Sequence, residues 1–175
     1  MKILTIIILV LQACSLSSKE MIIGEERISP GIIIKFEAAP KDSIYPSNFF
    51  LEESETDIHI EMLINWAEDS PSESPIGGFI PYLNVSAVIK NNDGNKLEVE
   101  LKPHLNLSDN FHYARNIKLP GPIDDKYDVI IKISPPTEGD LGIHKDWKDK
   151  YGSLIGEYIF KYYDLSFENI AIQTR

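Results

Sequence analysis

Histidine occurs four times in this chain, and each occurrence lies in a setting that suits a metal ligand. Imidazole nitrogen binds copper, zinc, iron and nickel, and a neighbouring carboxylate adds charge and hardness to such a site. The four residues are His59, His104, His112 and His144. For any one of them, the simpler interpretation is a surface or hydrogen-bonded residue. Taken together they favour a metal site, because nearly all lie where strand ends and loops are expected to gather.

The segment around His59 alternates polar and apolar residues. Side chains of a strand point alternately to its two faces, so a strand here would carry Asp57, His59 and Glu61 on one face. The opposite face would carry Ile58, Ile60 and Met62. The pattern therefore predicts an imidazole with a carboxylate beside it, at strand spacing.

The elements that must position these residues are strands. From residue 21 onward, short apolar or alternating segments are separated by Pro, Gly, Asn and Asp. We predict strands at 21–24, 31–37, 56–66, 82–91, 96–102, 112–119, 127–134 and 157–165, and a turn or two of helix at 145–151. Residues 91–95 (Asn-Asn-Asp-Gly-Asn) predict a hairpin turn. They do not fit a calcium loop, because Gly94 as its sixth residue would put Ile89 at the first position, where an acidic ligand is required. The pattern indicates an all-β immunoglobulin-like antiparallel β-sandwich of about seven or eight strands.

The amino terminus has the features of a secretory signal. A basic start precedes an apolar run over residues 3–10, interrupted only by Thr5, and Leu11-Gln-Ala-Cys14 follows. The run is too short for a membrane-spanning helix, which needs about 20 apolar residues. The ending resembles a bacterial lipobox, in which the signal is cut before a cysteine that is then lipidated. An ordinary signal with a stray cysteine is the alternative. We expect a signal peptide at 1–13, a lipidated tether at 14–20 and one domain at 21–175, anchored by lipid in the periplasm or at the cell surface.

Composition narrows the classes of function. The formal net charge is −10, which makes nucleic acid a poor partner, since binding it relies on Lys and Arg. Cys14 is the only cysteine, so an intrachain disulfide is impossible. The sequence contains no Gly-x-Ser-x-Gly elbow, phosphate-binding glycine loop or His-Glu-x-x-His zinc helix. We therefore expect no catalytic residues of these kinds.

Several stretches, taken in order, resemble one family. They are 56–61 (Thr-Asp-Ile-His-Ile-Glu), 79–83 (Phe-Ile-Pro-Tyr-Leu), 101–104 (Leu-Lys-Pro-His), 112–117 (His-Tyr-Ala-Arg-Asn-Ile), and 133–135 (Ile-Ser-Pro) leading to 142–144 (Gly-Ile-His). Over about residues 22–163 the chain resembles the periplasmic iron-transport lipoproteins, which include a spirochaete membrane antigen and periplasmic proteins encoded beside iron permeases.

The resemblance implies an immunoglobulin-like sandwich, often dimeric, with a copper-type site. The ligands carried over by position are His59, His112 and His144, with Glu61 close to the metal. The family commonly has a methionine where this chain has His104. A thioether favours Cu(I), whereas a fourth imidazole shifts the preference toward Cu(II), Zn(II) or another borderline divalent ion.

Further carboxylates lie near these positions. Asp109, with Glu25 or Asp57, could contribute to an adjacent second metal site. We therefore expect a lipid-anchored, extracytoplasmic metal-binding protein, as a homodimer, that takes part in iron uptake. Copper, or zinc in its place, would occupy the histidine site, and iron would be bound or passed at the carboxylates toward an inner-membrane permease.

Three alternatives remain open at this stage. The first is a surface antigen or adhesin that binds a host protein, with a metal that serves only structure. The second is a copper-dependent ferrous oxidase, which needs an open coordination position. The third is a structural zinc site closed by four protein ligands.

Overall fold

The computed structural model describes residues 20–70 and 73–174, so the predicted signal peptide and Cys14 lie outside the described residues. The fold is all-β, as predicted, and every strand pairing is antiparallel. The strands are β1 (Met21–Ile28), β2 (Ile32–Pro40), β3 (Ile58–Trp66), β4 (Asn84–Asn91), β5 (Lys96–Asn106), β6 (Asn110–Ile117), β7 (Lys126–Ser134) and β8 (Tyr158–Ser166). Two short α-helices, α1 (Lys145–Tyr151) and α2 (Glu168–Ala171), and two 3-10 turns, η1 (Ser47–Phe49) and η2 (Glu53–Glu55), complete the described elements.

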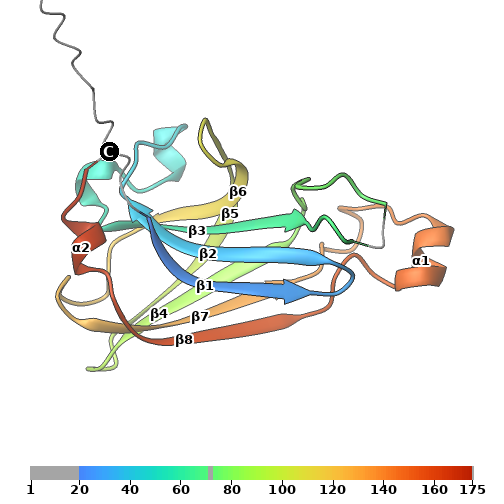
Figure 1. The fold of residues 1–175 in the computed structure, drawn as a ribbon. Helices are drawn as coiled ribbons and strands as arrows, with labels where there is room; N and C mark the ends of the chain where they lie inside the picture. The colour runs from blue at the N-terminus through green and yellow to red at the C-terminus, as the bar shows by residue number, and fades with distance from the viewer. Residues whose placement is uncertain (1–19, 71–72, 175) are drawn as a thin grey trace, which may run out of the picture.

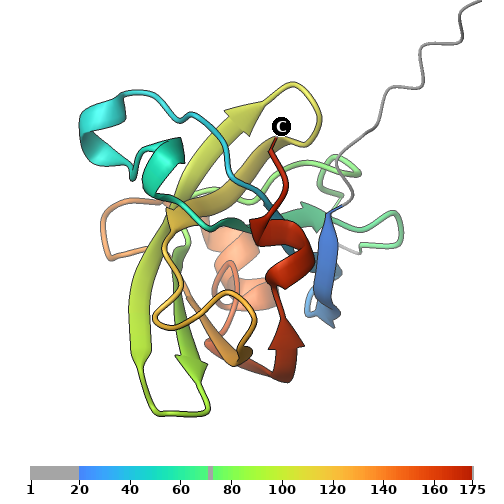
Figure 2. The same cartoon turned by 90° about the vertical axis from the view of Figure 1, so that its left-hand side faces the viewer.

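The eight strands form one sheet in the order β1-β2-β3-β6-β5-β4-β7-β8, which folds over onto itself (Figure 1). Strand β5 belongs to both halves, because it pairs with β4 up to Leu101 and with β6 from Lys102 onward. The two edge strands meet at Gly24, where a Cβ atom would lie 2.2 Å from the ring of Tyr162. The Tyr162 hydroxyl donates a hydrogen bond of 2.9 Å to Glu26 of β1. The sheet is therefore a nearly closed barrel, and α2 lies across one end of it (Figure 2).

The hydrophobic core fills the space between the two halves. The apolar face of β3 is completely buried there, through Ile58, Ile60, Met62 and Ile64. The ring of Phe36 packs against Phe160 and Tyr162 of β8, at centroid distances of 5.4 and 5.8 Å. The alternating pattern of the sequence therefore set which face of each strand turns inward. Among the described residues, no helix is long and apolar enough to cross a membrane.

Two predicted details of the strands have definite outcomes. The hairpin turn at 91–95 is confirmed, since Gly94 takes a φ of 89° and its N–H donates to the carbonyl of Asn91. Strand β5 extends beyond its predicted end at Lys102 to Asn106. The strand was expected to end before Pro103, which has no backbone N–H to donate. From Lys102 onward, however, β5 pairs with β6 and forms an edge of the sheet, where a proline can be accommodated. His104 therefore lies inside a strand.

Candidate metal centre

Three of the four histidines converge on the outer face of the β3-β6-β5 part of the sheet. His59 comes from β3, His104 from β5 and His112 from β6, and each offers a ring nitrogen within 4.8 Å of the others. His104 and His112 are direct cross-strand partners. All three are buried, with exposed fractions of 2%, 8% and 1% respectively. Residues separated by up to 53 positions in the chain therefore form one cluster, because the order of the strands places β6 between β3 and β5.

An asparagine fixes the orientation of His59. Asn116, the cross-strand partner of His59, donates its amide N–H groups to the backbone carbonyls of Asp42 (2.7 Å) and Leu51 (2.9 Å). Its carboxamide oxygen therefore faces Nδ1 of His59 at 2.7 Å and accepts a hydrogen bond from the N–H at this nitrogen. Nε2 of His59 then carries the lone pair and lies 3.5 Å from Oε1 of Glu61. A hydrogen bond at the other ring nitrogen is the usual way in which a protein orients a metal-binding histidine.

A backbone carbonyl orients His112 in the same way. Nδ1 of His112 donates to the carbonyl of Asn110 over 3.1 Å, which leaves the lone pair on Nε2. Asn110 takes a φ of 61°, a left-handed conformation that asparagine tolerates better than most residues. In the same hairpin turn, Asn106 exchanges two hydrogen bonds with Asp109, of 2.8 and 2.6 Å. The β5–β6 turn therefore holds both His112 and Asp109 in place.

His104 differs from the other two because neither of its ring nitrogens has a hydrogen-bond partner among the described residues. Its ring meets the edge of Phe50 at 4.9 Å. Burial lowers the pKa of His104 to about 4, and the charges of His112 and Arg115 act in the same direction, against an opposing effect of Asp42. The side chain is therefore neutral at neutral pH, as a ligand must be.

The donor set fits a transition-metal ion. A buried polar atom without a partner costs about 1–3 kcal/mol, and native proteins contain few of them. A metal ion among the three imidazoles would supply the partner that His104 lacks. Neutral imidazoles suit copper, zinc, iron and nickel, and Glu61 adds a negative charge beside them.

The segment between β2 and β3 covers the cluster. Residues 41–57 fold over the outer face of the sheet, held by the hydrogen bonds of Asn116 and by the contact between Phe50 and His104. A cavity of about 340 Å³ lies beneath this segment and is lined by all three histidines. Two residues on the predicted polar face of β3, His59 and Glu61, are therefore buried like the apolar face, whereas Leu63 and Asn65 further along β3 are only partly buried.

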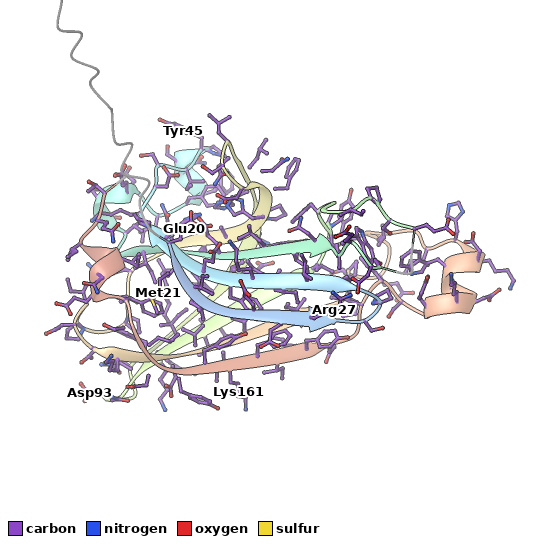
Figure 3. The ribbon with its side chains drawn as sticks, viewed as in Figure 1. Glu20, Met21, Arg27, Tyr45, Asp93 and Lys161 are labelled. Carbon is purple, nitrogen blue, oxygen red and sulfur yellow. The ribbon has the colours of Figure 1, made fainter. Side chains whose placement is uncertain are left out.

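A second cluster, made of carboxylates, lies next to the histidines. Carboxylate oxygens of Glu20, Glu61 and Asp109 lie within 4.8 Å of one another. Glu61 connects this cluster to the histidines, since its Oε1 lies 3.5 Å from Nε2 of His59. Figure 3 shows Glu20 at the start of β1. Asp109 was predicted from the sequence but Glu20 was not, because only the pairing of β1 with β2 and of β2 with β3 brings Glu20 beside Glu61.

The other carboxylates proposed for a second site are not part of this cluster. Asp57 accepts a hydrogen bond of 2.8 Å from the backbone N–H of Leu119, which is a structural contact. Glu25 is exposed and lines a separate cavity with Arg27 and Leu63. Asp57 directly precedes β3, and its carboxylate binds the backbone that follows β6.

His144 lies at the opposite end of the fold. It is exposed and directly precedes α1, at the far right of Figure 1. In α1, Trp147 packs against Trp66 at a ring-centroid distance of 5.9 Å. Trp66 is separated from His59 by seven residues of β3, or roughly 23 Å of strand. Within one copy of the chain His144 does not reach the cluster, and its role as a ligand stays a prediction that requires a second copy.

The sequence of this chain matches a known family over most of its length. A family model described as Fe2+ transport protein matches residues 17–169. The chain belongs to this family. The resemblance inferred from the five short motifs is therefore confirmed.

Individual similar proteins show how far the likeness extends. A UPF0423 protein of Brucella abortus is 28% identical over 152 residues, which cover 83% of this chain and 82% of that protein. The 34 kDa membrane antigen of Treponema pallidum is 28% identical over 134 residues, or 73% of this chain and 63% of the antigen. Among solved structures, the copper-reconstituted P19 protein of Campylobacter jejuni has a TM-score of 0.69 at 25% identity, covering 83% of this chain and 94% of that one. FetP of a uropathogenic Escherichia coli strain has a TM-score of 0.67 at 27% identity, covering 83% and 95%.

Proposed function

We propose that this protein is an extracytoplasmic metal-binding protein of iron uptake, with copper held by His59, His104 and His112 beside Glu61. The observation that carries the proposal is the convergence of three buried imidazoles within 4.8 Å, one of which, His104, has no hydrogen-bond partner in the described part of the chain. Membership of an Fe2+ transport family and the likeness to a copper-reconstituted protein support it. Zinc is the alternative occupant, because a third imidazole in place of a thioether widens the choice of divalent ion.

The chain's own residues give this site its chemical character. Asn116 and the carbonyl of Asn110 keep His59 and His112 in the tautomer that presents Nε2. Residues 41–57 limit the access of water to the cluster. Bound copper would supply one-electron chemistry there, which zinc cannot. We place the protein among carriers rather than enzymes, and the redox question is decided by whether ferrous iron is turned over.

Iron is proposed as cargo at the carboxylate cluster of Glu20, Glu61 and Asp109. Carboxylate oxygen is a harder ligand than imidazole and suits Fe²⁺ or a comparable hard cation. Glu61 of this cluster also contacts His59 of the histidine cluster, so the two cations would lie close together. From this site iron would pass to an inner-membrane permease.

The same proposal includes a lipid anchor at Cys14 and a homodimer. Anchoring predicts that Cys14→Ser moves the protein from the membrane fraction to the soluble fraction of the cell. In a dimer, the exposed His144 of one copy could reach the cluster of the other. Replacement of His144 by alanine would then weaken copper binding only at concentrations at which the chain is dimeric, as measured by analytical ultracentrifugation.

The central test is a metal titration of the purified, metal-free protein. Wild type is expected to bind one Cu²⁺ per histidine cluster, and His59→Ala, His104→Ala and His112→Ala are each expected to lose that binding. The matched control is a histidine-to-alanine change at 144 in monomeric protein, which should bind copper as wild type does. Metal binding that is indifferent to all three cluster variants would end the proposal.

A second candidate function, that of a surface antigen, is supported by the similar protein named as a membrane antigen. A surface antigen would bind a host protein, with the metal serving only structure. A pull-down of that partner that survives alanine at both His59 and His112 would favour this role over metal transfer.

A further inference from the structure

A fourth acidic residue, Glu37, lies next to the carboxylate cluster of Glu20, Glu61 and Asp109 without being part of it. It lies on β2 directly opposite Glu61 of β3 and is only 2% exposed. Its Oε1 contacts Nζ of Lys35 at 2.9 Å. Its Oε2 has no hydrogen-bond partner among the described residues. Like charges directly opposite each other on neighbouring strands are destabilising, and buried carboxylates are normally paired or bound to a metal.

Lys35 connects Glu37 to the rest of the cluster. Burial by itself would lower the pKa of Lys35, but the hydrogen bond from Lys35 to Glu37 and the charges of Glu37, Glu20 and Asp109 outweigh burial and raise it. The negative charges of Glu37, Glu20 and Asp109, on three separate segments, therefore all favour the charged form of Lys35. Its ammonium group forms its ion pair with Glu37, at 2.9 Å.

We propose that Glu37 is a further oxygen ligand of the cation bound by Glu20, Glu61 and Asp109, and that Lys35 is the counter-ion which this cation displaces from Glu37. The inference rests on the proposed function in one respect, namely that the carboxylate cluster binds a hard cation. Glu37 adds a fourth carboxylate to a site whose preferred ions take six or more oxygens. A divalent ion brings twice the charge of the ammonium group, so it can replace Lys35, whereas a monovalent ion gains nothing by doing so.

The test is a titration of the full-length protein with Mn²⁺, a hard divalent ion that is stable in air. Glu37→Gln is expected to weaken Mn²⁺ binding about tenfold or more, and Lys35→Gln to tighten it severalfold. The matched control is Glu98→Gln, which removes one exposed carboxylate from β5 on the part that pairs with β4. Cu²⁺ binding at the histidines is expected to stay unchanged in all three variants and reports that each one is folded.

The double variant Lys35→Gln/Glu37→Gln guards against a variant that fails to fold. It removes the ion pair without leaving one buried charge alone, and it is expected to bind Mn²⁺ as weakly as Glu37→Gln does. Equal Mn²⁺ affinity in Glu37→Gln and Glu98→Gln would overturn the role of Glu37, and unchanged or weaker binding in Lys35→Gln would overturn that of Lys35.

A further pair of variants separates this inference from the function on which it rests. If Glu61→Gln and Asp109→Asn abolish Mn²⁺ binding while Glu37→Gln does not, the carboxylate site stands and only the present inference fails. If wild type binds no Mn²⁺, the proposed carboxylate site fails as well.

Discussion

Replacement of His104 by methionine should stabilise the metal-free protein, and should do so more strongly in acid. Both ring nitrogens of His104 are buried without a hydrogen-bond partner, and burial lowers its pKa from 6.5 to about 4. A methionine has a similar volume and no such polar atoms. Relief of the unpartnered nitrogens is worth about 1–3 kcal/mol at neutral pH.

The pH dependence follows from the direction of this shift. A group whose pKa is lower in the folded chain than in the unfolded chain stabilises the fold above the unfolded pKa, and this contribution is lost as the pH falls toward the folded value. The pKa of His104 is 6.5 in the unfolded chain and about 4 in the folded chain. Its titration therefore lowers the unfolding free energy of wild type by about 2 kcal/mol as the pH falls from about 7.5 to about 5. The methionine variant does not titrate at this position and is spared that loss.

The assay is urea unfolding of chelator-treated wild type and His104→Met at both pH values. Because other groups titrate in both proteins, the informative quantity is the difference between the two losses of unfolding free energy. The matched control is His144→Met, at an exposed histidine whose ring keeps its water in both states. A difference below about 0.5 kcal/mol for His104→Met would show that the buried, neutral state described for this ring is wrong.

Three further predictions follow from the same geometry. Asn116→Ala removes the hydrogen bonds that orient His59 and hold the covering segment, residues 41–57. The unfolding free energy should fall by about 2–3 kcal/mol, and copper affinity should fall about 10–100-fold. A metal titration that shows unchanged copper affinity would contradict the orienting role of Asn116. Gly24→Ala places a Cβ atom 2.2 Å from the ring of Tyr162, so the unfolding free energy from thermal unfolding should fall by about 1–3 kcal/mol. An unchanged melting temperature would mean that β1 and β8 do not meet at this residue. In a thermal shift assay, Cu²⁺ at 100 times its dissociation constant should stabilise wild type by about 2.7 kcal/mol and should not stabilise His59→Ala. An equal shift in the two proteins would mean that copper binds at another site.

Much of the fold was readable from local patterns. The alternation around His59 predicted which residues of β3 share a face, and the Asn-Asp-Gly turn predicted the hairpin between β4 and β5. The period of two and the turn chemistry are local properties, so a single segment is enough to reveal them. The motif at 79–83 and the one at 112–117 were found separately, and the structure joins them: the hydroxyl of Tyr113 accepts from the N–H of Leu83 and donates to the carbonyl of Ile80.

The sequence by itself therefore determined an all-β chain, the faces of its strands and a set of histidines and acids suited to metals. Only the tertiary structure decided which of them meet. The order of the strands brings His59, His104 and His112 together, and leaves His144 at the other end of the fold. It also places Glu20 beside Glu61, and Glu37 opposite it, although neither carries a local signal. The reason is that a strand's own residues fix which way a side chain points, whereas its neighbours are fixed by the pairing of segments far apart in the chain.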